Sequence, residues 1–187
     1  KTMLPHITSL IVDTMGNTLN LDESTQRNLE LVRNLQDGSK KYTLLEVLDY
    51  TRTSMGARRL KKWLLSPLLR KEEIEKRQGI VNFLYKDQIL LSTLREISGK
   101  ILDLERLSAK IAMERAHAKD LLGVKSSFTD VLGIIDLISP SPEMGDFGEP
   151  LNKNKKIIKE LIELLEKSIT EEPSLQLNEG KLIKEGY

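Results

Sequence analysis

The sequence predicts an all-α fold, an elongated bundle of about six helices with a short extended segment at each end. Hydrophobic residues make up 39% of the chain and aromatic residues only 4%, so leucine and isoleucine carry most of the apolar content. This composition favours helices over a β-sandwich, which draws on valine, threonine and tyrosine. Apolar residues also recur every three or four positions along most of the chain, as on one face of a helix.

Composition also argues against several functional classes. The net charge is +1, from 29 basic and 28 acidic residues, whereas a domain that binds a phosphate backbone by itself usually has a basic excess. The absence of cysteine excludes a disulfide framework and a thiolate metal site. No apolar run is long enough to cross a bilayer, and we expect no membrane partner. Because the sequence starts at Lys1 and not at a methionine, we expect a piece of a larger protein.

The stretch over residues 49–67 has the strongest helical pattern. Thr51 and Thr53 can accept a hydrogen bond from the first turn of a helix, and Pro67 cannot continue one. One face of this helix is lined by Gly56, Leu60, Trp63 and Leu64. We predict that this helix is the centre of the packing, and that another backbone passes close to its glycine.

The neighbouring elements follow from caps and periodicity. Asp22 is expected to cap a helix that ends at Asp37 and Gly38. Residues 42–48 form a short second helix with Leu44, Leu45 and Leu48 inward. We expect a helix over residues 70–85, whose inner face is formed by Ile74, Arg77 or Gln78, Val81 and Leu84.

The second half of the sequence shows further helical periods. Helical spacing continues over residues 88–98 and from residue 103. A strongly amphipathic helix covers residues 119–138. Residues 143–150, rich in glycine and proline, are expected to form an exposed loop. A last helix over residues 151–169 has a broad apolar face.

Residues 49–68 also carry a resemblance to a known family. They read D-x-T-x-T-x-M-G-x-R-x-L-K-x-W-L-x-x-P-L, which resembles the core (lever) domain of the MutS family of DNA mismatch repair proteins. Residues 21–31, residues 103–107 with Ala118, Asp120 and Leu121, and more weakly residues 74–84 resemble the same domain. The resemblance implies that residues 1–20 end the connector, that residues 21–170 form the helical core, and that residues 171–187 begin the clamp insertion.

The resemblance implies a mechanical role. In that family, the core links the mismatch-binding and clamp domains to an ATPase domain. The whole protein binds mismatched duplex DNA, uses ATP and Mg²⁺, acts as a dimer, and meets a MutL-type partner at the bacterial nucleoid in the cytoplasm. For these 187 residues we therefore expect no catalytic, cofactor or metal site. The candidate contacts to other domains are Arg27, Asn28, Arg58, Arg59, Arg77 and Arg106.

Signals of enzymatic chemistry are weak. A phosphate-binding loop needs G-x-x-x-x-G-K-[S/T]. The most similar stretch contains Gly99 and Lys100, but Leu94 replaces the first glycine and Ile101 replaces the serine or threonine. His6 has no partner in sequence. His117 and Asp120 are three residues apart but lack further ligands, so a structural role is favoured. The letters of the family's Phe-x-Glu mismatch probe occur at residues 147–149, after the matching segments and not before them, which indicates a chance match.

Two other functional classes stay open. One is an unrelated, stand-alone helical module that docks a protein partner in an apolar groove. The other is a nucleic-acid binder that uses Arg52, Arg58, Arg59, Lys61 and Lys62. These cations lack interleaved aromatic residues, so a solvated or docking face is favoured. In the family the core chain returns after the clamp, and that part is missing here. We therefore expect the last helix to expose apolar surface and to drive self-association.

Overall fold

The computed structural model describes residues 17–171, 173–174 and 182–186, except the side chains of residues 146, 147 and 151. His6 and most of the extended N-terminal segment lie outside this range. The elements in chain order are α1 Glu23–Asn28, α2 Leu44–Leu48, α3 Ser54–Leu65, α4 Lys71–Lys86, α5 Gln88–Ser98, α6 Leu104–Ala112, α7 Ala118–Ile138, the 3₁₀ helix η1 Pro142–Met144 and α8 Gly145–Ser168. The only β-structure in the described range is two isolated bridges, Thr18 with Leu68 and Ile169 with Ile183. The predicted all-α fold is confirmed.

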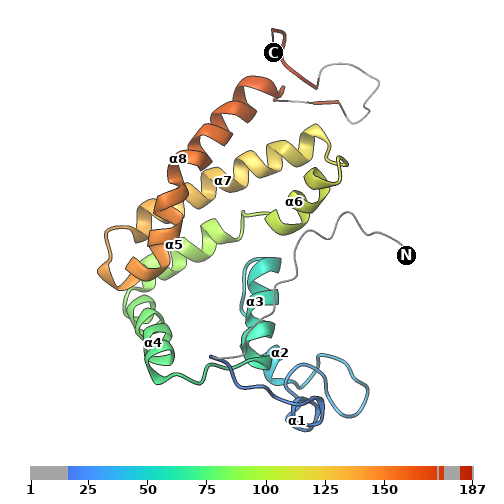
Figure 1. Ribbon diagram of the computed structural model, residues 1–187, viewed down its shortest axis with the longest axis vertical. Coiled ribbons are helices and arrows are strands. Elements are labelled where there is room, and N and C mark those ends of the chain that lie inside the picture. The colour runs from blue at the N-terminus through green and yellow to red at the C-terminus, as the bar shows by residue number, and fades with distance from the viewer. Residues whose placement is uncertain (1–16, 172, 175–181, 187) are drawn as a thin grey trace, which may run out of the picture.

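The buried core lies between α6, α7 and α8. Its centre is formed by Leu107, Val124, Leu165 and Ile169. Figure 1 shows α7 and α8 packed together in the upper half, and α1, α2 and α3 in the lower half. The longest helices, α7 and α8, share the most extensive contact, because each presents an apolar stripe of several turns to the other.

The prediction that α3 is the centre of the packing is wrong. Thr53 does cap the helix as predicted, since its hydroxyl accepts from the N–H of Gly56 at 2.9 Å. However, α3 contains no buried residue. A Cβ at Gly56 would lie 3.0 Å from the Thr53 hydroxyl. The glycine therefore makes room for its own cap, and not for another helix.

Helix α1 is shorter than predicted and ends at Asn28 instead of Asp37. Glu30 has a φ of 46°, and its carboxylate accepts from the N–H of Leu35 at 2.6 Å. The side-chain oxygen of Asn34 accepts from three successive N–H groups, those of residues 36, 37 and 38, at 3.1, 2.9 and 3.1 Å. These side chains bind the backbone N–H groups that a longer helix would have used.

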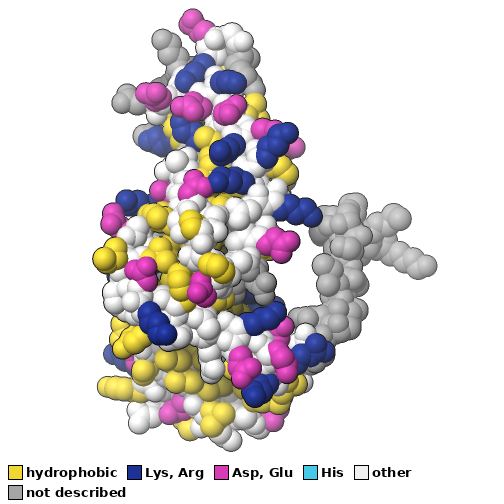
Figure 2. All heavy atoms as spheres, turned by 90° about the vertical axis from the view of Figure 1, so that its left-hand side faces the viewer, with side chains coloured by type: hydrophobic (Ala, Val, Ile, Leu, Met, Phe, Trp, Pro, Cys, Tyr) yellow, Lys and Arg dark blue, Asp and Glu magenta, His cyan; other side chains and the backbone are white. Residues whose placement is uncertain are grey.

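Helix α4 turns inward only part of the predicted face. Arg77 and Leu84 are half-buried as predicted, but Ile74 is 37% exposed and Val81 is 67% exposed. Ile80 and Phe83, which were not predicted to face inward, are half-buried. Figure 2 looks onto the side of the molecule where α4 lies and shows hydrophobic side chains gathered there. The helix is apolar on two faces, so periodicity alone could not choose between them.

Two further inward assignments are wrong. In α2, Leu45 is buried at 7% exposure, but Leu44 and Leu48 are 42% and 46% exposed. Only one leucine of this five-residue helix reaches the interior, because a single turn and a half presents a narrow inner face.

Residues 143–150 do not form the predicted loop. They complete η1 and the first turns of α8, which includes Pro150. Met144 anchors the turn with only 7% exposure, and the proline costs this helix a single backbone hydrogen bond. Further along, α8 leaves Ile157 63% and Leu164 47% exposed. Self-association through this face stays a prediction.

Candidate functional site

Arg58 on α3 joins the lower helices to the core. Its two terminal nitrogens bind the two carboxylate oxygens of Asp103 at 2.8 Å each, and its Nε binds Glu105 at 3.0 Å. Asp103 is the N-cap residue of α6. Two parallel N–H···O bonds fix direction as well as distance. The hydrogen bond from Arg58 is the main cause that lowers the pKa of Asp103 to about 2, and the two carboxylates raise the pKa of Arg58.

The segment before Asp103 is seated on α7. The N–H of Leu102 donates to the hydroxyl of Ser127 at 3.0 Å, and Ser127 is fully buried. A Cβ at Gly123 would lie 2.7 Å from a methyl carbon of Leu102. A small residue and a buried hydroxyl therefore place Leu102 against α7. Because Asp103 follows directly, Arg58 binds a carboxylate whose position is fixed by the core.

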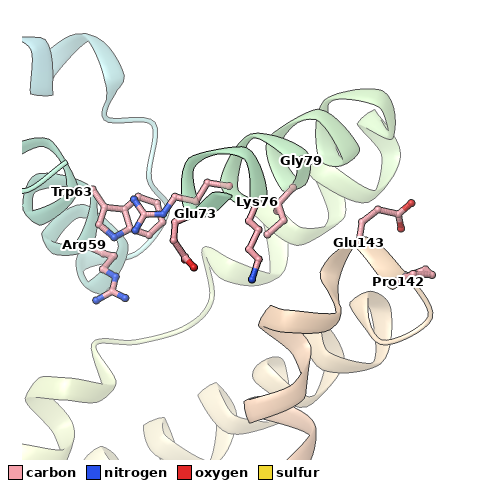
Figure 3. Close-up of a pocket in the computed structure, with 9 residues that line it drawn as sticks. Arg59, Trp63, Glu73, Lys76, Gly79, Pro142 and Glu143 are labelled. Carbon is pink, nitrogen blue, oxygen red and sulfur yellow. The ribbon is translucent and has the colours of Figure 1, made fainter. Parts of the chain in front are cut away.

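Helix α3 makes a second contact with its neighbours at Trp63, which packs against α4. The guanidinium carbon of Arg77 lies 3.9 Å from the centre of the indole ring, and that of Arg59 lies 5.7 Å from it. Such cation–π contacts stabilise a structure by about 0.5–1 kcal/mol each at exposed sites. Burial, followed by the charge of Arg59, lowers the pKa of Arg77. The three side chains border a pocket of about 540 Å³ (Figure 3).

The structure thus places the six predicted contact residues in three groups. Arg58 and Arg106 meet at Asp103, where Arg106 Nε lies 3.4 Å from the carboxylate. Arg59 and Arg77 meet at Trp63. Arg27 and Asn28 lie apart from both groups, on α1, and border a hollow with Leu35.

The sequence pattern did not identify the residues that bind Arg58 or position its partner. Asp103 could have been recognised as a helix cap, since an aspartate directly before a helical period is a typical N-cap. Ser127 and Gly123 carried no such signal, because both lie inside a regular helical pattern.

The basic residues of α3 do not form a single patch of unpaired positive charge. Arg58 is ion-paired and Arg59 lies over an aromatic ring.

His117 and Asp120, considered above as a catalytic or metal-binding pair, form contacts that stabilise the start of a helix. The backbone N–H of His117 donates to the carboxylate of Asp120 at 3.0 Å, and Lys110 binds the same carboxylate at 2.9 Å. These contacts, the His117 bond first, lower the pKa of Asp120 and fix the start of α7.

The described residues contain no group of three or more histidine, cysteine or carboxylate side chains arranged to hold a metal ion. None of the helices in the described part of the chain is both long and apolar enough to span a membrane.

Comparison with known proteins identifies the domain. The family described as MutS domain III matches residues 24–185. DNA mismatch repair protein MutS of Treponema denticola is 41% identical over 184 residues, which cover 98% of this chain and 20% of that protein. The protein of the same name from Clostridium perfringens is 40% identical over 190 residues, which cover 100% of this chain and 20% of that protein. The chain spans about a fifth of the length of these relatives, and it belongs to the MutS domain III family of DNA mismatch repair proteins.

Proposed function

We propose that this domain is a mechanical coupler within a longer mismatch repair protein. In this role it links the parts that bind DNA to the part that binds nucleotide. The observation that carries the proposal is the Arg58–Asp103 contact at 2.8 Å, because it ties the lower helices to a core of long helices through one directional joint. The match to the MutS domain III family argues against the alternative of an unrelated helical module.

Long packed helices suit transmission of a displacement. Helix α7 has 21 residues and α8 has 24, so each spans about 30–36 Å at 1.5 Å per residue. Packed interiors respond to a push as rigid bodies and do not absorb it by bending. A displacement of α3 at one end would therefore be carried by Asp103 and α6 to the α7–α8 pair.

The same proposal assigns the other activities to other parts of the protein. The 187-residue sequence lacks G-x-x-x-x-G-K-[S/T], so ATP and Mg²⁺ would bind elsewhere in the longer chain, and this domain would not be an enzyme by itself. Its partners would be the other domains of its own chain and, through them, mismatched duplex DNA, a second subunit and a MutL-type protein. The compartment would be the bacterial cytoplasm, at the nucleoid.

The test uses the full-length protein with Arg58→Gln. Coupling is measured as the ratio of dissociation rates from a mismatched duplex with and without ATP. Couplings of this kind amount to about 5–150-fold, and we expect the variant to lose most of its ratio while it still binds the duplex and hydrolyses ATP. Arg106→Gln is the matched control, because Arg106 meets the same carboxylate from within α6 and is 80% exposed. A normal ratio in Arg58→Gln would refute the role of this joint.

A further inference from the structure

The pocket at Trp63 is built by three separate elements. Arg59 and Trp63 come from α3, Lys76 and Arg77 from α4, and Glu143 from η1. Its volume is about 540 Å³, which is ample for one or two side chains. Figure 3 shows Trp63 and Arg59 on one side, Lys76 and Gly79 on α4, and Glu143 on the opposite side. A group bound here would touch all three elements at once.

The guanidinium groups in this pocket form no ion pair with a carboxylate of the described residues, although Glu73 lies near enough to act on Arg77 electrostatically. Arg77 and Arg59 both lie over the indole ring of Trp63, at 3.9 and 5.7 Å, and neither forms an ion pair with a described carboxylate. A guanidinium has five N–H donors, and a ring face satisfies none of them as a carboxylate would. Arg77 is half-buried, so its donors are partly shielded from water and favour a bound acceptor.

We propose that this pocket receives the carboxylate of an aspartate or glutamate from another domain of the same protein. The proposal rests on the proposed function in that it assumes neighbouring domains, and the relatives are about five times as long as this chain. Arg59 and Arg77 lie over one indole ring, and their N–H donors can bind the two oxygens of a single carboxylate. Glu73 and Glu143 line the same pocket and would repel a chain of phosphates.

Because the carboxylate and the pocket belong to one polypeptide, a weak affinity between them is sufficient for binding. Two sites on one polypeptide meet at an effective concentration in the millimolar range. A carboxylate that binds two guanidinium groups weakly in free solution would therefore occupy the pocket within the folded protein. The bound group would lock α3, α4 and η1 to the neighbouring domain.

Gly79 offers a way to block the pocket without disturbing the fold. A Cβ at Gly79 would meet no atom within 4 Å, and the residue lies inside α4, where any other non-proline side chain is at least as favourable as glycine. Gly79→Leu should therefore fill the pocket. Gly133→Leu is the matched control, because a Cβ at Gly133 also meets nothing within 4 Å and the residue lies on α7, outside the pocket lining.

The test is carbodiimide cross-linking of the full-length protein without DNA, because this reagent joins a lysine amine directly to a carboxylate. Mass spectrometry should find Lys76 joined to an aspartate or glutamate outside these 187 residues. The link should fall at least about fivefold in Gly79→Leu and stay within about twofold of wild type in Gly133→Leu. Thermal melts that match wild type verify that both variants fold.

Two results would overturn the proposal. One is a Lys76 link only to carboxylates within these 187 residues, and the other is an equal yield in the two leucine variants. Cross-linking measures whether a carboxylate occupies the pocket, and it does not measure the coupling between DNA binding and ATP. If the ATP-dependent release of DNA proves independent of Arg58 while the link persists, the coupling role fails and the carboxylate site stands.

Discussion

Ser127→Ala tests whether the core fixes the position of Asp103. The substitution leaves the N–H of Leu102 without its acceptor, the fully buried hydroxyl of Ser127 at 3.0 Å. An unsatisfied buried donor costs about 1–3 kcal/mol, and because Leu102 itself is 49% exposed, the cost here should be about 1–2 kcal/mol. Alanine recovers about 0.5 kcal/mol of helix propensity. The net loss in free energy of unfolding is therefore about 0.5–1.5 kcal/mol.

The assay is thermal and urea unfolding of the 187-residue chain followed by circular dichroism. For a chain of this size each kcal/mol shifts Tm by about 3 °C, so Tm should fall by about 2–5 °C, with an unchanged urea m-value. Ser126→Ala is the matched control, since Ser126 is its exposed neighbour on the same helix, and its Tm should stay the same or rise slightly. Equal Tm values for the two variants would show that the hydroxyl does not hold Leu102.

Four substitutions test the core, the joint and the open helix surface. Leu165→Ala, at 7% exposure, should lower the free energy of unfolding by about 2–5 kcal/mol; Leu164→Ala, at 47% exposure, should lower it by less than about 1 kcal/mol, as measured by urea unfolding. Arg58→Gln should raise the pKa of Asp103 from about 2 toward its ordinary 3.8, as followed by NMR of the carboxyl carbon. Because folding depresses this pKa, the contribution of the pair is complete above about pH 4 and is lost as the pH falls toward 2. Gly133→Ala meets nothing within 4 Å and should raise the free energy of unfolding by about 0.5–1 kcal/mol.

Local signals predicted the elements whose ends are set by nearby residues. Thr53 and Pro67 bound α3, and a helical period with a serine–proline stop bounds α7, because caps and prolines act within one turn. The end of α1 was missed because the side chains of Glu30 and Asn34 replace helical hydrogen bonds in a way that no period reveals.

Long-range choices could not be predicted. The inward face of α4 depends on which neighbours it meets, and both of its faces are apolar. The partners of Arg58 lie 45 and 47 residues away in sequence, so its family resemblance marked the residue without indicating what it binds. Arg59 and Arg77 were likewise marked separately, although one tryptophan brings them together.

The joint between α3 and α6 consists of charged groups near the surface, with Arg58 42% exposed. Dissolved ions screen such groups over about 8 Å at physiological ionic strength, and over shorter distances as salt is added. The hydrocarbon contacts between α7 and α8 have no such sensitivity. Concentrated salt should therefore loosen the lower helices while the upper ones stay folded. The contact between α3 and α6 therefore has a stiffness that the surrounding electrolyte sets.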